Sequence, residues 1–209
     1  MKINYHIHTL FSDGTATMIE YCDRAVQQGF DEIAFTDHVT IYPDGKKSQH
    51  SLDKDLLPDY IDAARDAKDK YKERLKEKLG LEVDYIPGNE NYIEELMGSY
   101  GFDLIIGSVH FVDNICIDCH RDKGKFDQEV QEDGFDAFYD RYMSLVEEAV
   151  RTGYFNVLGH MDLVRIWGFT PNGGTVQERR VLNSVKEHGM ALEVSSRGLR
   201  HPRKRMASF

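Results

Sequence analysis

The chain has 209 residues and a mass of 24.1 kDa, which suits one domain but is short for a complete α/β barrel of about 250 residues. Its 36 acidic and 26 basic residues give a formal charge of −10, which argues against broad electrostatic attraction to nucleic acid or to an anionic membrane. An anionic substrate would therefore need a local positive site, such as bound metal. From its length we expect a single domain over residues 1–209. The three cysteines, an odd number, and the lack of a secretory or long apolar run indicate the reducing cytoplasm.

Six short β-prone segments alternate with helical segments along the chain. Several of these segments are continuous apolar runs, which are typical of strands buried on both faces of a parallel sheet. The first helix opens with Thr17 and Glu20 at capping-box spacing. The pattern predicts a parallel α/β architecture with right-handed crossovers. Strands are expected at 2–8, 33–37, 81–86, 103–109, 155–159 and 190–195, and helices near 17–29, 53–79, 89–98, 133–152 and 175–188.

The first strand carries His6 and His8, two histidines separated by one residue. Side chains at positions i and i+2 of a strand point to the same face, so both imidazoles can reach one ion. A single His-x-His pair is a weak signal, because isolated histidines near loops are usually structural. Repetition of metal-ligating residues at later strand ends strengthens the metal interpretation.

Five later positions continue this pattern. The loop after the first strand contains Asp13, the second strand ends in His38, the third opens with Glu82, and the fourth and fifth end in His110 and His160. Active sites of α/β barrels are built at the carboxyl ends of the strands, so these side chains are expected to converge.

Five imidazoles and two carboxylates form a nitrogen and oxygen ligand set that favours Zn²⁺, Mn²⁺ or Fe²⁺. Seven ligands exceed the need of one tetrahedral ion, so we expect two or more ions, with Glu82 shared between them. Two ions about 3.5–4 Å apart can convert a bound water to hydroxide near neutral pH and hold a phosphoryl group. Hydrolysis of a phosphate ester at such a site needs no protein nucleophile, because the hydroxide attacks the phosphorus.

These motifs also carry a family resemblance. The order H-x-H-x4-D, T-D-H, G-x-E, G-S-V-H and G-H-x-D-L resembles the polymerase-and-histidinol-phosphatase (PHP) family, over essentially residues 3–201. The spans LEVDYIPGNENYIEEL, FDLIIGSVHFVDN, FNVLGHMDLVR and LEVSSRGLR resemble its monofunctional histidinol-phosphatase branch. The resemblance implies a distorted (βα)7 TIM-like barrel that hydrolyses phosphate esters with up to three divalent metal ions.

The resemblance also implies a division of the ligands among three ions. His6, His8 and Glu82 would hold the first ion, Glu82, His110 and His160 the second, and Asp13 and His38 the third. The family adds an Asp-x-His pair after a seventh strand, and no such pair follows Glu193 in this sequence. We therefore expect a barrel with six readable strands that is incomplete at its C-terminus.

The expected reaction is hydrolysis of L-histidinol phosphate to L-histidinol and phosphate in histidine biosynthesis. Arg165 and Arg197 follow the fifth and sixth strands and are candidates for binding the phosphate, although either position also suits a surface arginine. The expected partner is a small phosphate ester, with no nucleic acid and no membrane. Two alternatives stay open: a PHP phosphoesterase acting on nucleotides or nucleic acid, and an inactive truncated barrel.

One further motif, Cys116-Ile-Asp-Cys119-His120, matches a c-type haem attachment sequence. Without an export signal we interpret it as a coincidental loop. Tyr5, Asp37 and Asp162 are expected to support or pack around the site without a catalytic role.

Overall fold

The computed structural model describes residues 1–42, 46, 48–172 and 176–195. The chain forms two compact units, Met1–Ile106 and Gly107–Phe209. The six expected strands are present in the order β1-β2-β3-β4-β7-β8, and the pairs β1–β2, β2–β3 and β7–β8 are parallel. The predicted parallel α/β architecture is therefore confirmed, whereas the expectation of a single domain stays a prediction.

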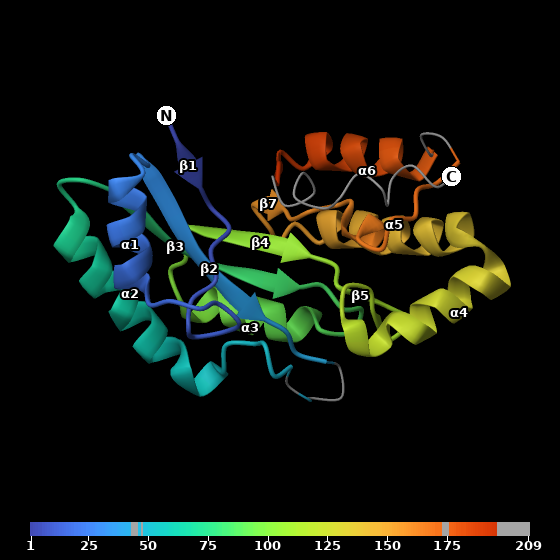
Figure 1. Cartoon of the computed structure of the whole chain (residues 1–209), viewed down its shortest axis with the longest axis horizontal. Coiled ribbons are helices and arrows are strands. Elements are labelled where there is room, and N and C mark those ends of the chain that lie inside the picture. Colours follow the sequence, from blue (N-terminus) through green and yellow to red (C-terminus); the bar gives the residue numbers. More distant parts are fainter. Residues whose placement is uncertain (43–45, 47, 173–175, 196–209) are drawn as a thin grey trace. The chain divides into compact units, whose positions relative to one another are not determined.

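The first unit contains most of the sheet (Figure 1). Its elements are β1 (Ile3–Asn4), α1 (Met18–Gln27), β2 (Glu32–Val39), a 3₁₀ turn (Lys54–Leu56), α2 (Leu57–Tyr71), β3 (Lys76–Asp84), α3 (Glu90–Ser99) and β4 (Leu104–Ser108), of which the last two residues belong to the second unit.

The core of the first unit lies between this sheet and its helices. β2 and β3 pair over eight residues, from Glu32 opposite Lys76 to Val39 opposite Val83. Almost every side chain of β2 is buried, including the apolar run Ile33–Phe35 and the polar Thr36 and Asp37 that follow it. Helices α1 and α2 lie side by side, and α2 buries Tyr60, whose hydroxyl donates to the Gly80 carbonyl at 2.9 Å (Figure 1).

Helix α1 begins as its sequence predicts. The Glu20 N–H donates to the Thr17 hydroxyl at 3.3 Å, and the Thr17 N–H donates to the Glu20 carboxylate at 2.8 Å. These two bonds satisfy backbone donors that a helix start otherwise leaves open. The helix ends two residues before Gly29, which adopts a φ of 68°.

Two element predictions were wrong at their boundaries. The helix expected at 53–79 ends at Tyr71, and residues 76–79 already belong to β3. Glu82 is therefore the seventh of the nine residues of β3 and does not open the strand. The Lys and Glu residues around position 76 resemble a charged helix surface, but here Lys76 is exposed and Glu77 is buried, as side chains on opposite faces of a strand.

The first strand is also shorter than expected. β1 ends at Asn4, but the following residues still run beside β2, because the Thr36 N–H donates to the Ile7 carbonyl at 2.9 Å. His6 and His8 therefore lie in an extended segment just beyond the strand.

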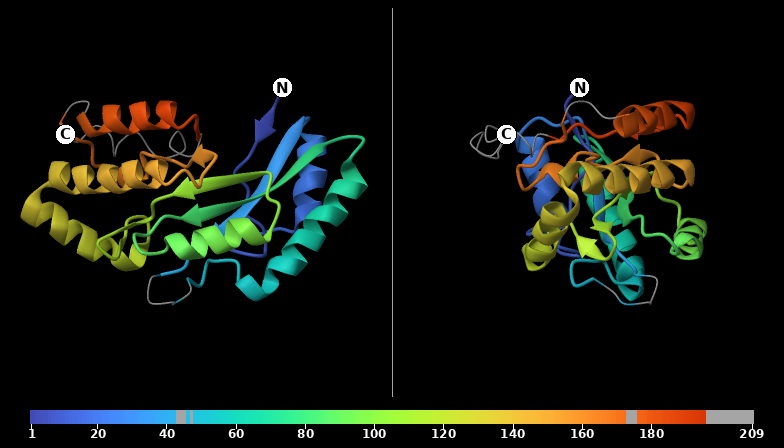
Figure 2. Two further views of the ribbon diagram at one scale, coloured as in Figure 1. Left: turned by 180° about the vertical axis from the view of Figure 1, so that it is seen from behind. Right: turned by 90° about the vertical axis from the view of Figure 1, so that its right-hand side faces the viewer.

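The second unit is mainly helical. Its elements are the hairpin strands β5 (Phe111–Val112) and β6 (Ile115–Cys116), a 3₁₀ turn (His120–Asp122), α4 (Lys123–Asp133), α5 (Phe135–Arg151), β7 (Val157–Leu158), a 3₁₀ turn (Leu163–Arg165), α6 (Val176–Glu187) and β8 (Ala191–Leu192). Helices α5 and α6 lie side by side (Figure 2). The helix α4 and the hairpin were not predicted from the sequence.

The cysteines divide between the two units. Cys116 and Cys119 form a disulfide in the second unit, and Cys22 is a buried free thiol on α1. The loop interpretation of Cys116–His120 did not include this disulfide. Among the helices in the described part of the chain, none has the length and apolar character needed to cross a bilayer.

Two glycines should respond oppositely to alanine. A Cβ at Gly80 would lie 2.5 Å from the Leu104 carbonyl oxygen, so Gly80→Ala should lower the free energy of unfolding by about 1–3 kcal/mol. Gly98 lies in α3 with open space around it, so Gly98→Ala should raise the free energy by about 0.5–1 kcal/mol. Urea unfolding measures both, and a stabilised Gly80→Ala protein would contradict the packing at β3.

Candidate metal centre

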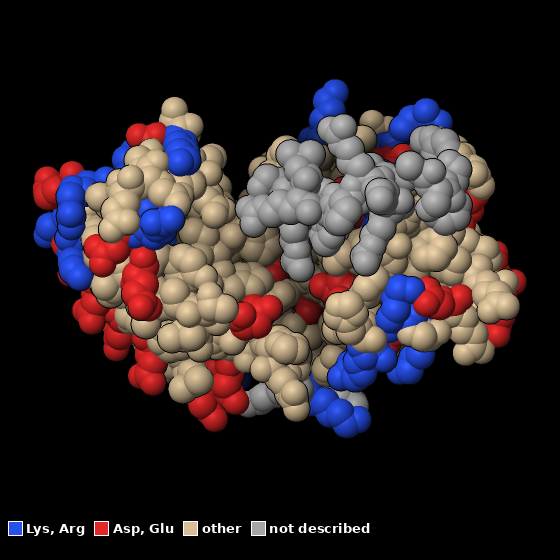
Figure 3. All heavy atoms as spheres, viewed as in Figure 1, with Lys and Arg blue, Asp and Glu red and all other residues tan. Residues whose placement is uncertain are grey.

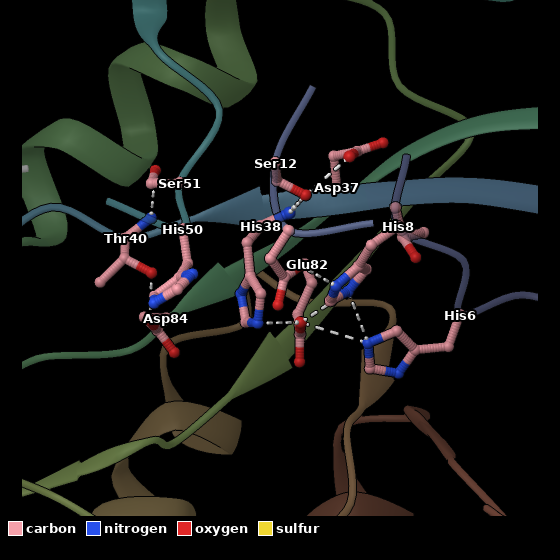
Figure 4. Close-up of polar contacts among 12 residues, drawn as sticks. His6, His8, Ser12, Asp37, His38, Thr40, His50, Ser51, Glu82 and Asp84 are labelled. Atoms are coloured by element: carbon pink, nitrogen blue, oxygen red, sulfur yellow. Dashed lines mark hydrogen bonds and ion pairs between the residues drawn. The ribbon is translucent and has the colours of Figure 1, made fainter. Parts of the chain in front are cut away.

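Glu82 lies at the centre of the predicted ligands of the first unit (Figure 4). Its side chain is 1% exposed, and its Oε2 atom lies 3.2 Å from His6 Nε2, 3.0 Å from His8 Nε2 and 3.0 Å from His38 Nε2. His38 is directly opposite Glu82 in the parallel register of β2 and β3. The carboxyl ends of these two strands therefore place one carboxylate against three imidazoles.

His6 and His8 reach this carboxylate from the segment after β1. Ile7 between them is held on both sides, because its N–H donates to the Thr36 hydroxyl at 3.2 Å and its carbonyl accepts from the Thr36 N–H at 2.9 Å. The two flanking imidazoles then share one side of the segment, with their Nε2 atoms 3.1 Å apart. This is the arrangement expected from their spacing in the sequence.

Asp13 adds a second carboxylate on the other side of His8. Its Oδ1 atom lies 2.7 Å from His8 Nδ1, while His8 Nε2 faces Glu82. His8, Asp13 and His38 form a second group whose potential ligand atoms lie within 4.8 Å of one another. An open hollow of about 320 Å³ borders His6, His8 and Asp13 and is also lined by Asn4 and Tyr21, among others.

The spacing of these atoms fits a metal site. A Zn²⁺ ion with bonds of about 2.0–2.1 Å to nitrogen separates tetrahedral ligands by about 3.3 Å. The nitrogen and oxygen atoms of His6, His8 and Glu82 are 3.0–3.2 Å apart. Because the donor set is imidazole and carboxylate, it suits Zn²⁺, Mn²⁺ or Fe²⁺. His6, His8 and Glu82 are thus placed to hold a divalent ion, and their assignment as ligands stays a prediction.

The charges of this centre perturb two pKa values in the metal-free protein. Burial lowers the pKa of His8, but hydrogen bonds to Asp13 and Glu82 outweigh it and raise the pKa to about 9. Burial raises the pKa of Asp13, but the hydrogen bond and charge of His8 outweigh it and lower the pKa to about 2. At neutral pH the metal-free site therefore holds a proton on His8 beside an ionised Asp13.

The second unit brings together the other two predicted histidines. The rings of His110 and His160 have centroids 5.0 Å apart and meet edge to face. The Ile117 N–H donates to the His110 carbonyl at 2.9 Å, and the His160 N–H donates to the Glu193 carboxylate at 2.9 Å. Their assignment as metal ligands stays a prediction.

The two predicted substrate-binding arginines have different outcomes. Arg165 donates to the Tyr139 hydroxyl at 2.7 Å and forms an ion pair with Glu178, which joins the turn after β7 to α5 and α6. Its role in substrate binding stays a prediction. Arg197 lies outside the described residues.

Sequence reasoning did not include Asp84 and Glu193 among the site residues. Asp84 ends β3, is buried, and accepts a hydrogen bond from the Thr40 hydroxyl. It stands two residues after Glu82, so strand periodicity alone would have placed it on the same face. The Glu193 carboxylate accepts from the His160 N–H because β8 pairs with β7, and a local sequence pattern does not predict this pairing.

The fold and this site define a parallel α/β protein with a cluster of histidines and carboxylates that could hold a divalent ion. Residues 4–197 match the model of the PHP domain family, and the chain belongs to that family. The resemblance found in the sequence motifs is therefore confirmed.

Individual relatives cover nearly the whole chain. It is 32% identical over 198 residues to a Deinococcus radiodurans protein named "Probable histidinol-phosphatase", covering 94% of this chain and 74% of the other. It is 29% identical to the histidinol-phosphatase of Bacillus subtilis, covering 95% of this chain and 82% of the other. A crystal structure of histidinol phosphate phosphatase from Lactococcus lactis, complexed with zinc, L-histidinol and phosphate, has a TM-score of 0.75 and 24% identity and covers 98% of this chain and 77% of the other. This last similarity establishes the fold.

Binding of Zn²⁺ at pH 7.5 should release about one proton or more per chain. The pKa of His8 is about 9 without metal, and a coordinating imidazole nitrogen must lose its proton. Calorimetric titration in two buffers of different ionisation enthalpy measures the number released. Asp13→Asn removes one of the carboxylates that raise this pKa and should release fewer protons. A binding enthalpy independent of the buffer would contradict this account.

Proposed function

We propose that the protein hydrolyses L-histidinol phosphate to L-histidinol and inorganic phosphate, using divalent metal ions. The observation that carries this proposal is the convergence of His6, His8 and His38 on one oxygen of Glu82. The names of the Deinococcus radiodurans and Bacillus subtilis relatives and the ligands of the Lactococcus lactis structure support this choice of substrate. A cytoplasmic location and a role in histidine biosynthesis form part of the proposal.

Divalent ions supply Lewis acidity, which offsets phosphoryl charge and activates water near neutral pH. The residues of the chain hold and orient them. Glu82 contributes negative charge at the centre of the three imidazoles. Asp13 lies against His8 Nδ1, so that His8 Nε2 faces Glu82, and Asp13 and His38 remain the predicted ligands of a further ion. His110 and His160 remain predicted ligands, and up to three ions are part of this proposal.

The charge of the protein argues against a nucleic-acid substrate. Acidic side chains follow the outer edge of the first unit where α2 lies (Figure 3), including the exposed Asp59, Asp62, Asp66 and Asp69. Together with the net charge of −10, these side chains repel a phosphodiester backbone. A small phosphate ester remains the better substrate.

Phosphate release from L-histidinol phosphate, by protein loaded with Mn²⁺ or Zn²⁺, tests the proposal. His8→Ala and Glu82→Ala should each lose bound metal and lower kcat/KM by at least about 100-fold, because even residues that only support a ligand cost 10–100-fold. Glu77→Gln is the matched control, since Glu77 is also a buried carboxylate of β3 but contacts the Cys22 thiol. Its activity should stay within about threefold of the wild type.

Two outcomes would count against the proposal. Activity that survives both chelation and the His8→Ala change would exclude metal-dependent hydrolysis. Folded, metal-loaded protein that does not turn over L-histidinol phosphate would favour an inactive truncated barrel. Turnover of a nucleotide in place of L-histidinol phosphate would favour a PHP phosphoesterase that acts on nucleotides or nucleic acid.

Arg165 needs a separate test because its observed contacts are structural. Arg165→Ala should lower the free energy of unfolding by about 1–2 kcal/mol, since Tyr139 and Glu178 lose a charged partner. If the guanidinium also binds phosphate, KM for L-histidinol phosphate should rise while kcat changes less. Arg180→Ala is the control, because exposed Arg180 pairs with Glu147, which Arg151 also contacts. An unchanged KM would remove Arg165 from the substrate site.

A further inference from the structure

Asp37 is a fully buried carboxylate beside the metal centre that is not among the predicted ligands. It lies near the end of β2, beside Ser12 (Figure 4), and accepts three hydrogen bonds from the loop after His8. Its Oδ1 accepts from the Thr9 N–H at 2.7 Å and from the Ser12 hydroxyl at 2.6 Å, and its Oδ2 accepts from the Thr9 hydroxyl at 2.9 Å. One side chain thus holds both ends of the segment 9–12.

The loop held by Asp37 has little freedom to move. The N–H groups of Ser12 and Gly14 both donate to the Thr9 carbonyl, at 3.1 and 2.9 Å. Gly14 passes so close to His8 that a Cβ on it would lie 2.1 Å from the His8 carbonyl oxygen. Asp13 is carried by this tight turn, and its carboxylate meets His8 Nδ1 at 2.7 Å.

Ser12 also links Asp37 to His38, the third residue of the His8, Asp13 and His38 group. The Ser12 hydroxyl that donates to Asp37 also accepts from the His38 N–H at 3.3 Å. Asp37 itself is tied to the helix layer, because its N–H donates to the Tyr60 hydroxyl at 3.5 Å. Asp37 therefore connects the loop that carries Asp13 to the strand that carries His38.

We propose that Asp37 is a positioning residue that sets the spacing of the His8, Asp13 and His38 group and so determines how tightly that group binds its ion. Asp37 acts without contacting the ion, through Thr9 and Ser12. The inference rests on the proposed metal centre but not on the identity of the substrate. Residues that orient ligands through hydrogen bonds typically change metal affinity by about 10–100-fold.

The test is a titration of the full-length, metal-free protein with Co²⁺, followed by visible absorption and by metal analysis after gel filtration. Asp37→Ala should bind one ion at least about 10-fold more weakly than the wild type and change the Co²⁺ spectrum. The ions bound elsewhere should keep their affinity. Glu77→Ala is the matched control, because it removes another buried carboxylate from the neighbouring strand and should leave both stoichiometry and spectrum unchanged.

Two further variants separate positioning from stability. In Asp37→Asn the amide oxygen still accepts from Thr9 N–H and Ser12, and the amide nitrogen meets the Thr9 hydroxyl, which can turn to accept. This variant should restore affinity to within about threefold. Ser12→Ala keeps the carboxylate but breaks the bridge to His38, and it replaces Asp37→Ala as the test if that protein does not fold.

Wild-type Co²⁺ affinity and spectrum in folded Asp37→Ala or Ser12→Ala would overturn the inference. An equal loss in Glu77→Ala would overturn it as well, because the effect would then follow general destabilisation. The titration involves no substrate, so failure of the wild type to hydrolyse L-histidinol phosphate would affect the proposed function and leave this inference standing.

Discussion

The site of the first unit depends on a single buried carboxylate, Glu82, that faces three imidazoles. An ionised group removed from water is costly unless opposite charge or metal compensates it. In the metal-free protein the compensation comes from a proton on His8, whose pKa is raised to about 9. A divalent ion bound here would replace that proton with a larger positive charge. The same geometry that forms an ion pair without metal would therefore suit the predicted ligand set.

The partners of Glu82 come from different elements, and hydrogen bonds fix the position of each along the strand direction. The parallel register sets His38 opposite Glu82, and the contacts between Ile7 and Thr36 fix where His6 and His8 lie along β2. The loop from Thr9 to Gly14 then returns Asp13 to His8. Because each of these positions is fixed by backbone hydrogen bonds, the ligand atoms need little rearrangement to receive an ion.

The second unit holds its histidines by a different means. Irregular segments, not long strands, surround His110 and His160, and polar side chains brace those segments. Arg141 of α5 is one such brace, since it forms ion pairs with Asp113, Glu129 and Asp133 at 2.6–3.2 Å. Trp167 is another, because its indole N–H donates to the Ile117 carbonyl at 2.6 Å, next to the disulfide between Cys116 and Cys119.

Local patterns in the sequence determined the α/β class, the six strands, the cap of α1 and the identity of the candidate ligands, because strand periodicity and capping act over a few residues. They misplaced the start of β3, since a run of alternating charges fits a helix surface and a strand edge equally well. Only the tertiary structure decided that His38 lies opposite Glu82, that Asp37 holds the loop of Asp13, and that Arg165 pairs with Glu178. These contacts join residues far apart in the chain, and their geometry depends on how strands and helices pack, which no local pattern records.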